Sequence, residues 1–153
     1  MTQEQLNKII ERHQHYLNKD INGWENMKAD LSYKNLNGLD LKESNLREAN
    51  LIHADLIEAN LSNADLKDAN LINANLAYAD LRNADLKEAN LRKVNLNNVN
   101  LREANLYGAN LSYADLNNSA LNNADLREAN LYRAFCYYTN LCGADLRNAD
   151  LRE

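Results

Sequence analysis

The sequence predicts an all-β solenoid, a chain that winds around its own hydrophobic interior and stacks the resulting coils along one axis. Leucine fills 24 of the 25 positions that recur every fifth residue from Leu31 to Leu151. Alanine stands two residues before 18 of these positions, and Asn or Asp stands directly before 23 of them. In an α-helix, residues five apart are about 140° past a full turn, so the leucines would reach every face. In a flat strand, alternate leucines would meet water. The chain must therefore turn steadily in one sense.

Each five-residue unit has two inward and three outward positions. Parity along an extended segment places the small residue, such as Ala49 or Ala54, on the same side as the leucine. The Asn or Asp between them faces outward, where its short side chain can hydrogen-bond its own backbone at a bend. The two remaining positions are polar and variable. The predicted core therefore includes Leu81 and Leu101, together with Cys136, which replaces leucine at one position of the series.

These repeats, of the form A-(D/N)-L-x-x, resemble those of the pentapeptide-repeat family over residues 29–153. The resemblance implies a right-handed quadrilateral β-helix in which four pentapeptides form one square coil. A 20-residue coil lies within the range of known solenoid periods. With coils spaced at about 4.8 Å, the 25 units would form about six coils and a rod roughly 30 Å long.

Residues 1–28 differ from the repeats and are predicted to form an N-terminal helix cap and a joint. Thr2 and Gln5 are spaced as a capping box that would begin a helix over residues 2–19. One face of this helix is apolar or aromatic and consists of Leu6, Ile9, Ile10, His13, Tyr16 and Leu17. The end of a solenoid exposes its interior and its unpaired edges, so we expect the helix to cover that end, with Trp24 filling the joint. A partner-binding helix is the alternative. Together with the repeats at 29–153, the cap makes a single structural domain.

Aromatic residues cluster where the repeat becomes irregular near the C-terminus. Four of the ten aromatic residues of the chain fall within seven positions, namely Tyr132, Phe135, Tyr137 and Tyr138. One interpretation is that these bulky side chains only shield the last coil. The favoured interpretation is a homodimer that joins two C-terminal coils and hides their exposed edges.

Composition is typical of a cytoplasmic protein. The chain contains no apolar run long enough to span a bilayer and no N-terminal signal peptide. Its two cysteines do not suggest a secreted disulfide framework. The abundance of Asn, Lys and Ile is characteristic of an AT-rich genome, so we expect a bacterial and cytoplasmic protein.

Enzyme chemistry has little support in the sequence. His13 and His15 lie two residues apart, so a helix would point them in different directions rather than toward one metal ion. We expect His13 to lie at the interface with the cap and His53 on a coil surface. No Gly-rich phosphate loop is present, and a solenoid with a filled interior has no cleft. The prediction is a protein that is not an enzyme and has no cofactor and no metal.

The 20-residue period sorts the outward residues onto sides of the rod. One side carries repeated charge pairs, which we interpret as a solvated lattice of ion pairs; these pairs are Arg47-Glu48, Lys67-Asp68, Lys87-Glu88 and Arg127-Glu128. Another side carries Ile52 and Ile72 one coil apart, with Ile57 and Tyr78 around the corner. An apolar ladder on an otherwise polar rod is a candidate contact surface.

Two functions are consistent with this sequence. The first is a non-catalytic protein-interaction or structural rod whose partner is unknown. The alternative comes from the resemblance, since some pentapeptide-repeat proteins act as DNA mimics that bind DNA gyrase and confer quinolone resistance. The net charge of −5 is weak for such mimicry, because a duplex about 30 Å long carries about 18 negative charges. The same acidity argues against nucleic-acid binding.

Overall fold

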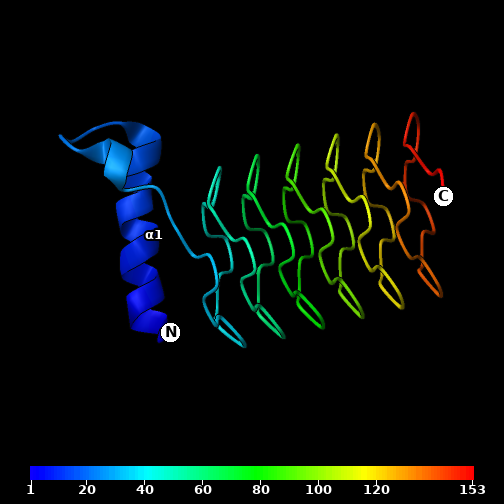
Figure 1. Ribbon diagram of the computed structural model, residues 1–153, viewed down its shortest axis with the longest axis horizontal. Coiled ribbons are helices and arrows are strands. Elements are labelled where there is room, and N and C mark those ends of the chain that lie inside the picture. The colour runs from blue at the N-terminus through cyan, green and yellow to red at the C-terminus, as the bar shows by residue number, and fades with distance from the viewer.

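The computed structural model describes residues 1–153 as a helical segment followed by a stack of similar coils (Figure 1). Helix α1 spans Gln3–Asn18, and a short 3-10 helix, η1, spans Trp24–Asn26. From residue 30 onward the chain alternates single bridging residues with turns as far as residue 150. The coils stack along the long axis of the molecule, with α1 at one end and the C-terminus at the other.

Neighbouring coils are joined by parallel bridges between residues 20 positions apart. These bridges run without a gap in register from Asp30 with Asn50 to Asn130 with Asp150. Each coil therefore contains four pentapeptides. The bridges are isolated and no extended strand forms, which departs from the simple expectation of an all-β chain. Each side is too short for a strand, because a turn follows every bridging residue within a few positions.

The five backbone N–H groups of one repeat all have acceptors, as residues 50–54 illustrate. Three of them bond neighbouring coils, one closes a turn and one bonds a side chain. In chain order, the acceptors are the carbonyl of Ala29, the carbonyl of Asn70, the Oδ1 of Asn50, the carbonyl of Ile72 and the carbonyl of Leu51. A repeat this short is stable only because each buried donor is satisfied.

This accounting explains why Asn or Asp precedes the leucine. The residue after the leucine has no backbone acceptor, and the Asn or Asp side chain supplies one: the Ile52 N–H donates to Asn50 Oδ1 over 3.3 Å. Phe135 cannot do this. There the preceding coil supplies the acceptor, since the Tyr137 N–H donates to Asn117 Oδ1 at 2.8 Å.

The second residue after each leucine has a positive φ. The values lie between 55° and 73° at every such position from Tyr33 to Asn148, yet only Gly38, Gly108 and Gly143 are glycines. A non-glycine residue in this region costs of order 1 kcal/mol. At most of the other positions the residue's N–H donates to a carbonyl of the next coil, as His53 does to Ile72 at 3.0 Å, and this bond holds the residue there.

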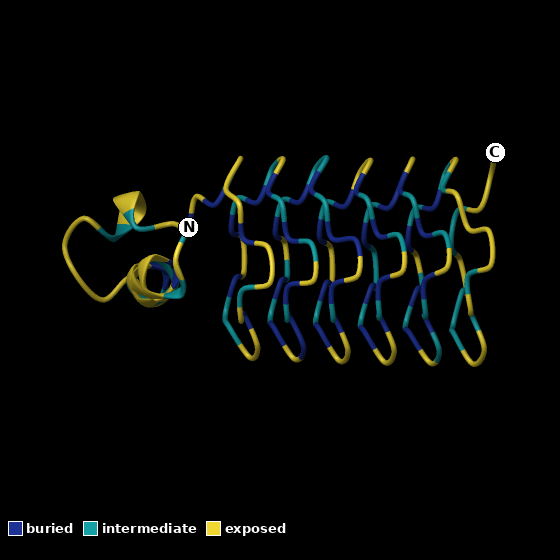
Figure 2. Ribbon diagram, turned by 90° about the horizontal axis from the view of Figure 1, so that it is seen from below, coloured by how far each residue is buried: buried dark blue, intermediate teal, exposed yellow.

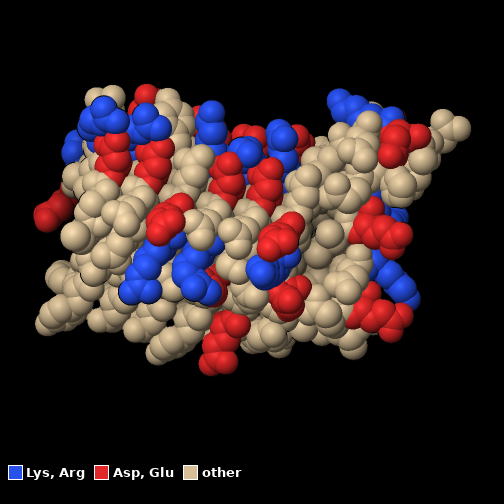
Figure 3. Space-filling view, turned by 180° about the vertical axis from the view of Figure 1, so that it is seen from behind, with Lys and Arg blue, Asp and Glu red and all other residues tan.

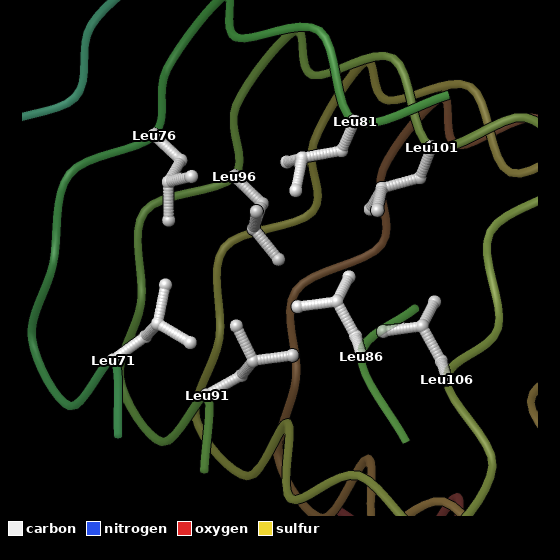
Figure 4. A pocket seen from close by; sticks show the side chains of 8 residues that line it. All are labelled: Leu71, Leu76, Leu81, Leu86, Leu91, Leu96, Leu101 and Leu106. Carbon is white, nitrogen blue, oxygen red and sulfur yellow. The ribbon is translucent and has the colours of Figure 1, made fainter. Parts of the chain in front are cut away.

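The interior is made of leucine and alanine. Leu81 and Leu101 are buried members of one continuous apolar cluster that runs from the cap to Leu131. Figure 2 shows the buried residues lining the inner surface of the stacked coils. Leucines from the sides of successive coils point toward one another in Figure 4 and leave no space for a water molecule between them. The rod therefore has a solid core.

Helix α1 covers the N-terminal end of the stack (Figure 1). Its side chains bond backbone groups of the first coil and of the segment that leads into it. The Gln3 amide bonds both the N–H and the carbonyl of Asp40, at 2.9 and 2.7 Å. Buried His13 accepts from the Ala29 N–H at Nδ1 and bonds the Arg47 carbonyl at Nε2. The imidazole must therefore be the neutral tautomer with its proton on Nε2.

The helix itself begins and packs as the sequence suggests. Thr2 is its N-cap, and both hydrogen bonds of the capping box with Gln5 are present. Leu6 is fully buried and joins the core cluster. In the joint, the Trp24 ring lies 5.9 Å from the Tyr16 ring and stays partly exposed. No helix in the structure combines the length and the apolar character needed to cross a bilayer.

Candidate interaction surfaces

The rod has four sides, which we name after the leucines of one coil: the Leu51, Leu56, Leu61 and Leu66 sides. On each side, the Asn or Asp before the leucine and the two residues after it face outward. The same three positions recur every 20 residues along the rod, about 4.8 Å apart. The surface is therefore a set of columns, and the chemistry of each side depends on which residues fill its columns.

The Leu66 side carries most of the paired charges. Lys67 bonds Asp85 of the next coil at 2.7 Å, and Asp85 raises the pKa of Lys67. Arg127 pairs with Asp125 at 2.7 Å and holds the pKa of that carboxyl below its ordinary value. Figure 3 shows Lys and Arg side chains beside Asp and Glu over much of one face of the molecule. The pairing is partial, because this side carries eight carboxylates against five cations and its column of Glu48, Asp68, Glu88 and Glu128 forms no ion pair. The side is a solvated, moderately acidic surface in which exposed ion pairs contribute little.

Most of these ion pairs form within one pentapeptide rather than between coils. Arg82, Arg147 and Arg152 each fold back onto the aspartate two residues earlier, at 2.6 to 2.7 Å. The pairs that link coils are Lys67 with Asp85 and, at 3.8 Å, Arg127 with Asp145. The lattice predicted across coils is thus largely a set of local Asp-x-Arg pairs.

One repeat interrupts the charges of the Leu66 side. Tyr107 takes the place of a cation, and its ring lies 5.2 Å from the Lys87 ammonium and 5.5 Å from the Arg127 guanidinium carbon. A hydrogen bond with Glu128 raises the pKa of the Tyr107 hydroxyl. Gly108 leaves room for the Glu88 carboxylate, which an added Cβ would approach to 2.8 Å. Both carboxylates are thereby drawn toward this repeat.

The predicted apolar contact residues lie where the period places them, but most are only partly exposed. Ile52, Ile57 and Ile72 are half-buried, whereas Tyr78 is 62% exposed. Ile52 and Ile72 belong to the Leu51 side, and Ile57 and Tyr78 belong to the Leu56 side. Their role in contacting a partner stays a prediction.

The C-terminal aromatic residues divide into two groups. Phe135, Tyr137 and Tyr138 are exposed on the Leu56 side, with Tyr138 91% exposed. Tyr132 is half-buried on the Leu51 side and meets the Tyr113 ring edge-on at 5.6 Å. Only the first group presents a free apolar surface, and its role in a dimer stays a prediction.

The placement of Cys136 in the core is wrong, since this cysteine is exposed. It keeps the register of the inward leucines, but no following coil covers it. The same openness leaves Leu141 and Leu146 only partly buried. Burial at an inward position requires cover on both sides, from another coil or, at the N-terminal end, from helix α1.

The sequence analysis missed the cations of the Leu51 side. Between residues 50 and 133 this side has no carboxylate in its outward columns, yet it carries Arg92, Lys93 and Arg133. None of these three cations forms an ion pair. Counting charges one side at a time, rather than over the whole rod, would have found them.

The remaining titratable residues do not converge on a site. His13 belongs to the cap, and the His53 ring stacks on Tyr33 at 4.9 Å. No three His, Cys, Asp or Glu side chains come together in a way that would hold a metal ion.

Comparison with known proteins identifies the class of this fold. The family described as pentapeptide repeats matches the chain with 8 copies, over residues 27–63, 49–87, 64–102, 84–123 and 109–148. The chain therefore belongs to the pentapeptide-repeat family, as the sequence resemblance indicated, and its fold is a pentapeptide-repeat solenoid. No curated protein matches it in sequence.

Several solved structures share the fold. A pentapeptide repeat protein from the thylakoid lumen of Arabidopsis thaliana is 35% identical, with a TM-score of 0.63, over 65% of this chain and 70% of that one. The pentapeptide repeat protein Rfr23 from the cyanobacterium Cyanothece 51142 is 31% identical, with a TM-score of 0.57, over 76% of this chain and 86% of that one. QnrB1, a plasmid-mediated fluoroquinolone resistance protein, is 22% identical, with a TM-score of 0.50, over 78% of this chain and 64% of that one. The last likeness shows the fold alone.

Proposed function

We propose that this protein is a non-catalytic interaction rod, a right-handed β-helix of about six coils whose sides bind another protein. One observation carries the proposal. The interior is filled by leucine and alanine without a water-sized space, so variable chemistry occurs only in the outward columns. A rigid scaffold that repeats every 20 residues presents side chains in fixed rows, as other solenoids present their binding surfaces.

Modulation of DNA gyrase by DNA mimicry is a weaker proposal. A mimic of duplex DNA needs rows of unpaired negative charge. On this rod one column of the Leu66 side, Glu48, Asp68, Glu88 and Glu128, forms no ion pair, but Gly108 interrupts it. The aspartates beside it pair with Lys67 and Arg127, and the Leu51 side carries cations. QnrB1 supports the shared fold only.

The proposal includes self-association through the last coil. The exposed rings of Phe135, Tyr137 and Tyr138 lie beside partly buried leucines. A two-fold contact there would bury these rings and would close the assembly at two copies. The contact would be small, so its strength would depend on the aromatic side chains.

Purification of the tagged protein from its native host under mild cross-linking tests the interaction function. We expect one protein to be enriched in stoichiometric amounts, and a reciprocal purification with that protein tagged should return the rod. Absence of any reproducible partner would contradict the proposal. The bacterial cytoplasm stays the predicted location, although one similar structure comes from a plant thylakoid lumen.

A further inference from the structure

The Leu51 side differs from the other three sides in its charge. The Leu56 side has no Lys or Arg in its outward columns and carries Asp55, Glu58 and Asp115. The Leu61 and Leu66 sides carry both signs. Only the Leu51 side has a long stretch, residues 50–133, with cations and no carboxylate. The whole chain has a net charge of −5, whereas this stretch of the Leu51 side is positively charged.

The cations of this side surround a pair of tyrosines. Lys93, Tyr113 and Arg133 follow one another in a single column, one coil apart. In the next column Arg92 is followed by Ser112 and Tyr132. The Arg133 guanidinium carbon lies 5.3 Å from the Tyr132 ring, and the two tyrosine rings meet edge-on at 5.6 Å. We define Arg92, Lys93, Tyr113, Tyr132 and Arg133 as the basic patch.

Nearby carboxylates are engaged elsewhere. Glu88 and Glu128 stand at the corner with the Leu66 side, and both are drawn toward the repeat of Tyr107. At the opposite corner, Asp115 Oδ1 accepts from the Asn117 N–H at 3.0 Å. Beyond the patch, Glu153 follows Arg133 in the same column but forms no ion pair with it, and Asp150 pairs with Arg152 at 2.7 Å. No carboxylate forms an ion pair with Arg92, Lys93 or Arg133, so these cations can pair with a ligand from outside.

Two isoleucines lie on the Leu51 side between the cap and the basic patch, among Asn and His side chains. Ile72 lies one coil before Arg92 in the same column, and Ile52 lies one coil further toward the cap. A ligand lying along this side would meet two isoleucines and then a cluster of cations and aromatic rings. The patch from Lys93 to Arg133 covers two coil spacings, roughly 10 Å, which matches three residues of an extended peptide.

We propose that the Leu51 side binds an acidic segment of a partner protein, with apolar residues of the segment on Ile52 and Ile72 and its carboxylates on Arg92, Lys93 and Arg133. This inference rests on the proposed interaction function and names the side and the chemistry of the partner. Guanidinium and ammonium groups on flexible stems suit carboxylates, and the rings supply contact area at low entropic cost.

A protein ligand fits better than a nucleic acid. The binding of a nucleic acid depends on neutralising many phosphates, and the basic patch offers only three cations. A nucleic-acid strand wider than the side would also meet Asp115 and Glu58 on the Leu56 side and the acidic columns of the Leu66 side. A short acidic peptide avoids that repulsion.

Fluorescence anisotropy with labelled probes tests the inference on the full-length protein. The probe is an octapeptide with the sequence Leu-Leu-Ser-Glu-Glu-Ser-Glu-Glu, compared with the same peptide carrying Lys for Glu and with an oligothymidylate of equal length. We expect the acidic peptide to bind at low salt and to weaken as salt rises, the lysine peptide not to bind, and the oligothymidylate to bind at least about tenfold more weakly.

Two triple variants of equal net charge locate the site. Arg92→Glu, Lys93→Glu and Arg133→Glu together should weaken peptide binding by about tenfold or more. The control carries Lys42→Glu, Arg82→Glu and Arg102→Glu on the Leu61 side and should change binding by less than about threefold. Circular dichroism checks that both variants fold.

Three results would overturn the inference: no acidic-peptide binding at about 1 mM, equal losses in both variants, or tighter binding of the oligothymidylate. The interaction function is judged separately. If the native partner is captured equally by wild type and by the basic-patch variant, only the assignment of the Leu51 side fails.

Discussion

Replacing Leu101 with alanine tests the solid interior, because this side chain is fully buried at mid-rod. The substitution removes three buried carbons, which is about 2.4 kcal/mol of transfer free energy at about 0.8 kcal/mol each. A cavity term adds to this where the surroundings cannot collapse. The Leu101 N–H bonds the carbonyl of Ala120, and the Asn100 carbonyl bonds the Leu81 N–H, so neighbouring coils hold this backbone on both sides. We therefore expect a loss of about 3–5 kcal/mol, in the upper part of the usual range of about 2–5 kcal/mol.

Denaturant unfolding followed by far-ultraviolet circular dichroism measures this loss. Leu151→Ala is the matched control, since it is the same substitution in the same register at a residue that is 60% exposed. The control should cost less than about 1 kcal/mol. A loss below about 1 kcal/mol at Leu101, or equal losses at both leucines, would refute the packing argument.

Three further outcomes are expected. Burial lowers the pKa of His13 from 6.5, with opposing effects from Arg47 and Glu48 and a reinforcing one from Lys28. Below pH 6.5 the unfolded chain therefore binds more protons than the folded chain, so the free energy of unfolding should fall as the pH drops from 6.5 toward the lower pKa of the folded state. The variant His13→Gln should remove most of this pH dependence, as measured by unfolding followed through Trp24 fluorescence. Light scattering should give about twice the chain mass of 17.4 kDa, and Tyr137→Glu with Tyr138→Glu should give monomer; a monomeric wild type at high concentration contradicts the dimer. In a gyrase supercoiling assay we expect neither inhibition nor rescue from a quinolone, and a dose-dependent effect would favour the DNA-mimic function.

The sequence was sufficient to predict the solenoid because its strongest signal is a burial pattern. Leucine in 24 of 25 equivalent positions leaves one way to keep every leucine from water, and the structure places these leucines inside from Leu31 to Leu131. The Asn or Asp preference was also readable, because the Asn50 side chain meets a definite need for an acceptor at the Ile52 N–H. Both requirements arise within a single repeat, so every repeat carries the same sequence signal.

The features that were missed depend on context beyond one repeat. The residues at positive φ, such as Tyr33 and Glu48, are rarely glycine, so their left-handed conformation could not be predicted from the residue type. Cys136 follows the inward register, but its burial depends on whether another coil lies beyond it. The basic patch appears only when charges are sorted side by side along the folded rod, because the overall charge is acidic.

Site-specific photo-cross-linking in the native host tests the central claim most directly, namely that one side of a passive rod binds a protein partner. The cross-linking residue replaces Arg92, Asn97, Arg102 or Tyr107, which occupy equivalent positions on the four sides of a single coil. Our account predicts a discrete protein adduct from position 92 that is stronger than any adduct from the other three positions. Equal adducts from all four sides, a strongest adduct from a side other than Leu51, or no adduct at position 92 would contradict it.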